Sequence, residues 1–175
     1  VAYHLEGILV KRGCLHHPFP IHVNYGCNTG RDLLWVQSVS TQAISRNSHF
    51  PLLNLGYTAA GPMTKMCLYE TAAWVIASVV CGASIEAEGV AKATHPDYLT
   101  PLEPQLATEV AYAALALDRP AANALLQRLV AKYEDQIPTA PLGKKYQECY
   151  DVESGTPSAE YIELYRQVKR ELVEL

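Results

Sequence analysis

The sequence predicts an α/β fold, the C-terminal part of a parallel α/β barrel followed by a helical extension. Three observations predict it. Helix and strand patterns alternate in the first half, and the second half shows only helix and loop patterns. Residues 52–70 run from an apolar strand through a small-residue corner directly into a long apolar helix. We therefore expect the last two βα units of a barrel in residues 1–82 and a helical extension packed on it in residues 83–175.

The first half is expected to contain a helix, a strand, a helix, a strand and a helix, over residues 1–12, 21–25, 31–45, 51–57 and 62–82. Pro62 suits the first turn of the last of these helices, and Gly82 suits its C-terminal end. Two strands do not make a stable parallel sheet alone, because such sheets are buried on both faces. Since Val1 also lies inside a helical pattern, we expect the chain to be a fragment of a longer protein.

The second half is expected to be helical. Thr100, Pro101 and Glu103 form a capping-box pattern that begins a helix reaching about residue 117. Pro120 begins a second helix, and a loop follows over residues 137–143. The last helix begins near residue 156, and its apolar stripe consists of Tyr161, Leu164, Tyr165, Val168 and Leu172.

Composition excludes several classes of protein. With 49% hydrophobic and 18% charged residues and a net charge of -4, the chain is globular, and a nucleic-acid-binding surface is disfavoured. Its longest apolar stretch, residues 72–81, is too short to span a bilayer, and no signal peptide is visible. The five cysteines are widely spaced without a Cys-x-x-Cys pair, which disfavours a zinc site or a disulfide framework and predicts a cytoplasmic protein.

One candidate site is the loop between the first strand and its helix. Gly26 and Gly30 permit close approach of a ligand to the backbone around Asn28, and Arg31 lies at the start of the helix. An arginine there holds a carboxylate or phosphate in bidentate fashion. The alternative, which we favour on this loop alone, is a glycine turn in which Arg31 pairs with a neighbouring acidic residue.

Tyr57 ends an otherwise apolar strand. Its hydroxyl group either faces a ligand, as a proton donor or acceptor, or lies in the core bonded to a backbone carbonyl. The sequence leaves both open. His16, His17 and His22 lack metal-ligand spacing and an acidic neighbour, so surface or hydrogen-bonded histidines are favoured over metal ligands. We expect no metal site.

Two segments carry a resemblance to a known family. Residues 61–70, Gly-Pro-Met-Thr-Lys-Met-Cys-Leu-Tyr-Glu, resemble the Gly-Pro-x-Thr-x-Met-Cys-Leu-x-Glu pattern of monomethylamine:corrinoid methyltransferases of methanogenic archaea. Residues 147–152 resemble that family as well, and so do Val1, Ala2, His4, Ile21, His22, Asn28 and Arg31 in register. The resemblance implies a (β/α)8 TIM barrel, of which this chain supplies the C-terminal part with strands seven and eight.

The resemblance also implies an activity. The enzyme transfers a methyl group from a methylamine to the corrinoid (cobalamin) of a partner protein during methanogenesis. The catalytic pyrrolysine of the family matches a position upstream of Val1, so no catalytic residue is expected in this chain. Tyr57 matches the tyrosine that lines the amine site at the end of strand eight. Leu55 stands where the family has glutamine, which a different amine or a homologue without pyrrolysine would explain.

The implied partners are a corrinoid protein and a small amine, with no membrane or nucleic acid, and the protein is expected to be a homo-oligomer. No tightly bound cofactor is expected in this chain, because the corrinoid belongs to the partner. The residues of the glycine loop, Gly26, Asn28, Gly30 and Arg31, would shape the mouth of the barrel. Two alternatives are a non-catalytic helical assembly module and a different TIM-barrel enzyme that binds a phosphorylated ligand at strands seven and eight.

Overall fold

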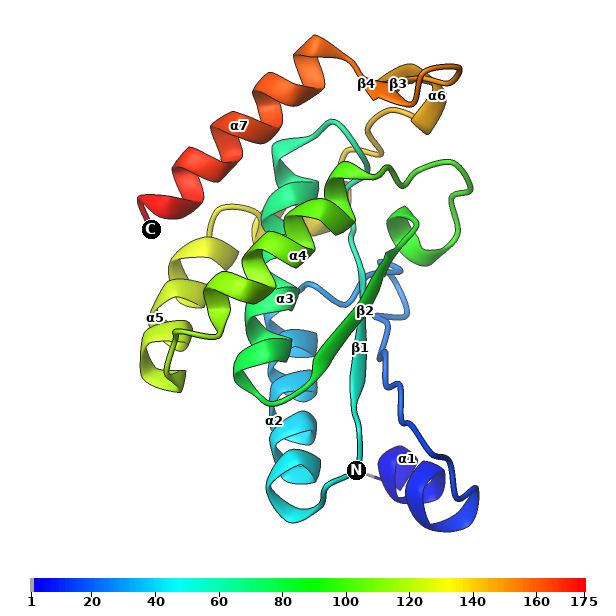
Figure 1. Cartoon of the computed structure of the whole chain (residues 1–175), viewed down its shortest axis with the longest axis vertical. Helices are drawn as coiled ribbons and strands as arrows, with labels where there is room; N and C mark the ends of the chain where they lie inside the picture. Colours follow the sequence, from blue (N-terminus) through cyan, green and yellow to red (C-terminus); the bar gives the residue numbers. More distant parts are fainter. Residues whose placement is uncertain (1) are drawn as a thin grey trace.

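The computed structural model describes residues 2–175 as a mixed α/β chain (Figure 1). Its α-helices are α1 (Ala2–Leu5), α2 (Arg31–Asn47), α3 (Lys65–Val80), α4 (Leu102–Ala114), α5 (Arg119–Val130), α6 (Tyr146–Cys149) and α7 (Ala159–Val173). Its strands are β1 (Leu53–Tyr57), β2 (Ser84–Gly89), β3 (Tyr150–Asp151) and β4 (Thr156–Pro157). Three further turns of helix are η1 (Glu6–Val10), η2 (Ala91–Ala93) and η3 (Glu134–Thr139).

Strand β1 has parallel neighbours on both edges. On one edge it pairs with β2, with Leu53 opposite Ser84 and Tyr57 opposite Gly89. On the other edge His16 makes a parallel bridge, since the N–H of Leu53 donates to the His16 carbonyl at 3.0 Å. Three chain segments therefore lie side by side in sequence order, connected through α2 and α3. The prediction of a strand over residues 51–57 between two helices is confirmed.

The strand expected over residues 21–25 is wrong. The N–H groups of Tyr25 and Gly26 both donate to the His22 carbonyl, at 3.2 and 2.9 Å, so this segment forms a turn. Pairing with β1 occurs earlier, at His16. Pro18 and Pro20 follow that point and lack the N–H groups that a continued ladder needs, which explains why the bridge stays isolated.

The strand β2 has no counterpart in the predicted elements. Its sequence, Ser-Ile-Glu-Ala-Glu-Gly, is largely polar and mostly exposed, and it lacks a clear apolar alternation. Because β2 pairs with β1, the sheet continues past residue 82, where the helical extension was expected to begin.

The predicted helices are largely confirmed, with hydrogen-bonded caps at several starts. The side chains of Thr64, Asp118 and Ser158 accept backbone N–H bonds at the first turns of α3, α5 and α7. The helix expected over residues 1–12 is shorter, since α1 gives way to the wider turn η1. Val1, which was placed in that helix, lies outside the described residues.

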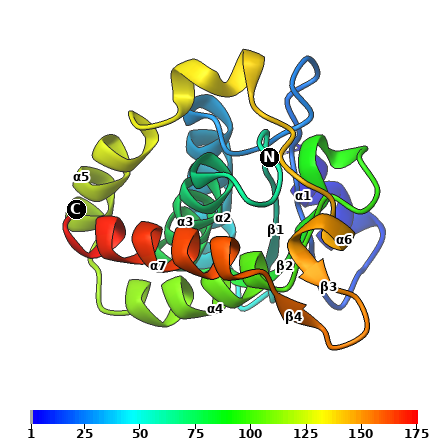
Figure 2. The ribbon, with the colours of Figure 1, turned by 90° about the horizontal axis from the view of Figure 1, so that it is seen from above.

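Helix α3 is the centre of the core. Every residue from Met66 to Ser78 is buried, and Trp74 is fully inaccessible to solvent. Helices α4, α5 and α7 surround α3, and the view from above shows α7 laid across this group (Figure 2). Burial on all sides explains the continuous apolar composition of α3.

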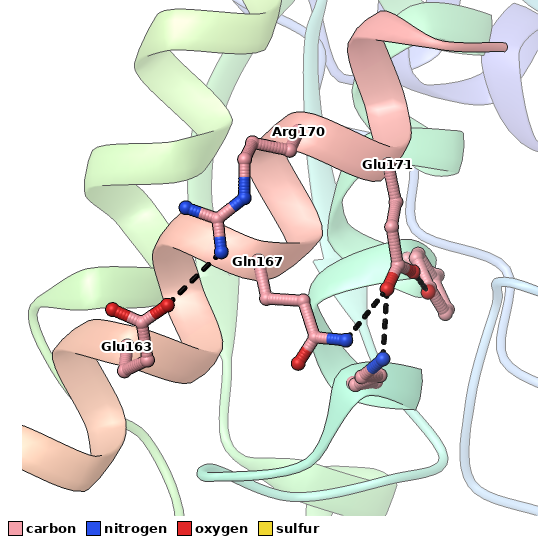
Figure 3. A network of polar contacts seen from close by, with 6 residues as sticks. Glu163, Gln167, Arg170 and Glu171 are labelled. Carbon is pink, nitrogen blue, oxygen red and sulfur yellow. Dashed lines mark hydrogen bonds and ion pairs between the residues drawn. The ribbon is translucent and has the colours of Figure 1, made fainter.

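A polar cluster attaches α7 to the start of α3 (Figure 3). The Glu171 carboxylate accepts hydrogen bonds from Lys65 Nζ at 2.8 Å, from Gln167 Nε2 at 3.0 Å and from the Tyr69 hydroxyl group. The hydrogen bond from Lys65 is the largest cause that lowers the pKa of Glu171, to about 2. The carboxylate thus fixes the C-terminal helix to the core.

Candidate active site at the carboxyl end of strand β1

The loop before α2 is joined to the edge of β1 by one buried amide. Asn28 is fully buried, and its Oδ1 accepts a hydrogen bond from the backbone N–H of Tyr57 at 2.8 Å. Its Nδ2 donates to the carbonyl of Leu55 at 2.8 Å, and its own N–H donates to the Tyr57 carbonyl at 2.9 Å. The Asn28 side chain thus takes the place of a strand neighbour beyond His16, and brings the glycine loop next to Leu55 and Tyr57.

A buried glutamate on α3 holds the same loop from the other side. Glu70 accepts hydrogen bonds from the backbone N–H groups of Ala59 at 2.7 Å and Ala60 at 2.9 Å, and from the Thr29 hydroxyl group. Burial raises the pKa of Glu70 to about 7, opposed by these three donors and by the charge of Lys92. Glu70 therefore fixes both the corner after β1 and the loop before α2.

The loop after β2 closes against the same corner. The N–H of Lys92 donates to the Thr58 carbonyl at 2.8 Å, and Lys92 Nζ reaches the Ala140 carbonyl at 3.4 Å. Lys92 has a φ of 53°, in the region that favours glycine. Gly26 has a φ of 66°, and a Cβ there would collide with the Lys92 carbonyl. A glycine is required at 26 for this close approach.

A fourth segment, residues 141–142, contacts the corner after β1. The Gly61 N–H donates to the Pro141 carbonyl at 3.0 Å, and a Cβ on Gly61 would collide with the Leu142 carbonyl. Tyr133, after α5, donates its hydroxyl hydrogen to the Thr29 carbonyl at 2.7 Å. Loops from four parts of the chain therefore meet at the carboxyl end of β1, the usual place for a site in parallel α/β folds.

The two faces of β1 have different neighbours. Asn54 donates to Thr41 of α2 at 3.4 Å, and Gly56 lies directly against the Trp74 ring of α3. Since side chains alternate along a strand, Leu55 and Tyr57 face away from these helices. The Tyr57 ring lies over Gly89 of β2, where a Cβ would collide with it.

Tyr57 is half-buried, and no hydrogen bond of its hydroxyl group is found among residues 2–175. This observation does not support the core alternative, in which a backbone carbonyl accepts from that hydroxyl. Its ring centroid lies 6.1 Å from that of Phe19. Leu55, which is 9% exposed, offers only an apolar side chain on this face. The face thus combines apolar contact with one phenol.

The Arg31 side chain is bonded to side chains of this chain. Its Nε and NH2 atoms bind the two carboxylate oxygens of Glu134 at 2.8 and 2.7 Å, and NH1 contacts Gln127. The hydrogen bonds from Arg31 lower the pKa of Glu134. The alternative in which Arg31 pairs with an acid is confirmed, and Gly30 serves as the residue before the first turn of α2. Within the glycine loop, Asn28 is the residue hydrogen-bonded to β1.

The histidines and cysteines named in the sequence analysis form no metal site among the described residues. Within the described part of the chain, no three His, Cys, Asp or Glu side chains are grouped closely enough to hold a metal ion. Cys67 is buried, which raises the pKa of its thiol well above the usual range. None of the described helices is both long and apolar enough to cross a membrane.

Sequence reasoning missed Glu70 and Glu86, and the expectation that His17 has no acidic neighbour is wrong. Glu70 had a visible signal, because it is the only acidic residue within the apolar run of α3. Glu86 and His17 lie in contact, with 2.7 Å between Oε2 and Nε2. They are 69 residues apart in sequence, so only the sheet brings them together.

The comparisons with known proteins agree with one another. The family model described as "Monomethylamine methyltransferase MtmB" matches residues 1–175. Monomethylamine methyltransferase MtmB2 of Methanosarcina barkeri is 34% identical over all of this chain and 38% of its own length. MtmB2 of Methanosarcina acetivorans has the same identity and coverage. The crystal structure of M. barkeri MtmB matches 99% of this chain with a TM-score of 0.94 and 33% identity, over 38% of that chain. The hydroxylamine MtmB complex matches with the same values.

Proposed function

Since the chain belongs to the monomethylamine methyltransferase MtmB family, we propose that it is the C-terminal part of an enzyme that transfers a methyl group from a methylamine to the corrinoid of a partner protein. The chain spans 38% of the length of the curated relatives it matches. The single observation that carries the proposal for this part is the placement of Tyr57 and Leu55 at the carboxyl end of β1, on the face away from the helices.

We propose that these strands belong to a (β/α)8 barrel. The parallel order of the His16 segment, β1 and β2, with α2 and α3 as crossovers, supports this architecture. It also suggests three consecutive strands rather than the two expected from the sequence, with Tyr57 on the middle one. In a barrel, Leu55 and Tyr57 would face the interior, since Asn54 and Gly56 face the helices.

The residues of this chain would bind and orient the amine. The Tyr57 hydroxyl group, at the end of its strand, would hydrogen-bond the amine or its adduct, and Leu55 would provide an apolar wall. An apolar wall keeps water from the reacting methyl group. Asn28 and Glu70 would hold Tyr57 in position through the strand backbone and the corner. The corrinoid, carried by the partner protein, would supply the cobalt that accepts the methyl group.

The leucine at 55 provides no hydrogen bond to the substrate, whereas the family pattern has a glutamine amide there. We propose that the substrate is a methylamine recognised with fewer hydrogen bonds than in the relatives. A relative crystallised as a hydroxylamine complex supports a site for a small nitrogen compound. We further propose a cytoplasmic homo-oligomer, in keeping with five free cysteines.

The phosphate-binding alternative is less well supported. It needs Arg31 to face a ligand, whereas both sides of its guanidinium group are used by Glu134 and Gln127. The assembly-module alternative leaves the four loops at the carboxyl end of β1 without a role.

The test uses the complete protein, its reduced corrinoid partner and mono-, di- or trimethylamine. Methylation of the cobalt is followed by the absorbance of the corrinoid. We expect methylation with one methylamine and none without amine. An unmethylated corrinoid with all three amines would contradict the proposed activity.

A further inference from the structure

We propose that Glu86 is the carboxylate that binds the ammonium group of the amine substrate, and that His17 positions it. The inference rests on the proposed function and adds the residue that recognises the positive charge of the substrate. It starts from an irregularity in the pairing of β1 with β2.

The register between these strands shifts in the middle. Asn54 pairs with Ile85 and Gly56 pairs with Glu88, so two residues of β2, Glu86 and Ala87, stand opposite the single residue Leu55. This is a β-bulge, a feature often found beside active sites because it redirects a side chain.

The bulge determines where the two glutamates of β2 point. Glu88 is 3% exposed and accepts a hydrogen bond from the Thr71 hydroxyl group of α3 at 2.6 Å, so it faces the helices. The Glu86 side chain contacts His17. His17 follows His16, the partner of Leu52, and therefore lies beside Leu53 on the face away from the helices. Glu86 thus shares the face of Leu55 and Tyr57.

The contact between Glu86 and His17 crosses β1 on that face. Glu86 belongs to one neighbour of β1 and His17 to the other, and their Oε2 and Nε2 atoms are 2.7 Å apart. The Glu86 and His17 side chains keep 42% and 28% of their surface exposed, so the carboxylate is accessible. An exposed pair of this kind adds little stability.

Aromatic rings adjoin the pair. The ring centroids of His17 and Phe19 are 4.8 Å apart, and Phe19 and Tyr57 follow at 6.1 Å. A carboxylate next to aromatic faces suits a small organic cation, because both attract positive charge while the rings contact the methyl group. At neutral pH a methylamine carries a positive charge, and an apolar site accepts that charge only beside an opposite one. Leu55 does not supply it.

The test measures methylammonium binding to the complete protein by titration calorimetry at pH 7, separately from methyl transfer. We expect Glu86→Gln to weaken binding about tenfold or more, as expected for a lost charge-assisted bond, with an unchanged melting temperature. Glu153→Gln, an exposed residue outside this face, is the matched control and should bind as the unaltered protein does. Glu86→Asp should retain part of the affinity.

His17 is tested by rescue. His17→Gln keeps a side-chain donor for Glu86 and should bind methylammonium more tightly than His17→Ala, which keeps none. Equal affinities of these two variants would overturn the positioning role.

The two proposals fail in different ways. If Glu86→Gln binds methylammonium normally while the unaltered protein methylates the corrinoid, the role of Glu86 is overturned and the activity stands. If the unaltered protein binds methylammonium through Glu86 without methylating the corrinoid, the binding role is supported and the activity is overturned. No saturable binding by the unaltered protein would overturn the role of Glu86.

Discussion

Asn28 and Tyr57 are joined by two hydrogen bonds: the backbone N–H of Asn28 donates to the Tyr57 carbonyl at 2.9 Å, and the N–H of Tyr57 donates to Asn28 Oδ1 at 2.8 Å. One buried residue of a loop thereby satisfies both backbone groups at the end of β1. A buried backbone group without a partner is costly, so this relationship fixes the loop and the strand end together.

The substitution Asn28→Asp should lower the stability of the protein. It replaces Nδ2, which donates to the Leu55 carbonyl, with a carboxylate oxygen, so two acceptors face one another in a buried place. We expect the free energy of unfolding in urea to fall by about 2 kcal/mol. Asn24→Asp, at an exposed position of the preceding turn, is the control and should leave the urea midpoint nearly unchanged. Equal effects of both changes would argue against the role of the Asn28 amide.

The buried carboxyl groups predict a decline of stability with rising pH. Burial raises the pKa of Glu70 and of Glu103 to about 7 in the folded protein, from 4.5 as the ordinary value. A raised pKa means that their contribution is fully present below pH 4.5 and is lost as the pH rises to about 7. The slope is about 1.4 kcal/mol per pH unit for each group within that window.

Glu70→Gln tests this directly. The variant should unfold more easily than the unaltered protein at pH 8. Glu70 accepts three hydrogen bonds, and in the variant an amide NH2 group faces at least one of these donors in place of a carboxylate oxygen. Its free energy of unfolding should also fall less steeply between pH 4.5 and 7. Chemical denaturation at four or five pH values gives both quantities. A variant with the same pH slope as the unaltered protein would show that Glu70 does not titrate in that window.

Glu171 predicts the opposite dependence at lower pH. Its pKa is lowered to about 2, so its contribution is present above pH 4.5 and is lost as the pH falls toward 2. Glu171→Gln should cost about 1 kcal/mol at pH 7, since the carboxylate is partly exposed, and should reduce the loss of stability in acid. Thermal unfolding at pH 7 and pH 3 measures both effects.

Glu163 provides a matched control on the same helix (Figure 3). Its one drawn partner is Arg170 at 2.9 Å, and both side chains are more than 60% exposed. Glu163→Gln should therefore change the melting temperature little. A loss as large as that of Glu171→Gln would contradict the distinction between the two glutamates.

The long helices and β1 could be predicted because local signals agree with their environment. Helix α3 is apolar throughout, begins after the capping residue Thr64 and ends before Gly82, and it is buried on all sides. Strand β1 is a short apolar run directly before it, so Tyr57 could be placed at a strand end.

The remaining parts depend on partners that a linear pattern does not reveal. In β2, the buried Glu88 carboxylate accepts a hydrogen bond from the Thr71 hydroxyl group of α3, and a bulge turns Glu86 to the other face. Residues 21–25 alternate like a strand, yet the pairing edge of β1 is used by His16 and Asn28. Only the assembled sheet determines which of these segments pairs.

The most direct test of the account is the rate of amine-dependent methylation of the corrinoid by the complete protein carrying Tyr57→Phe. The change removes one hydroxyl group and keeps the ring that lies over Gly89. We predict a rate about tenfold or more below that of the unaltered protein, with an unchanged melting temperature. An equal rate would contradict the placement of the amine at the end of β1.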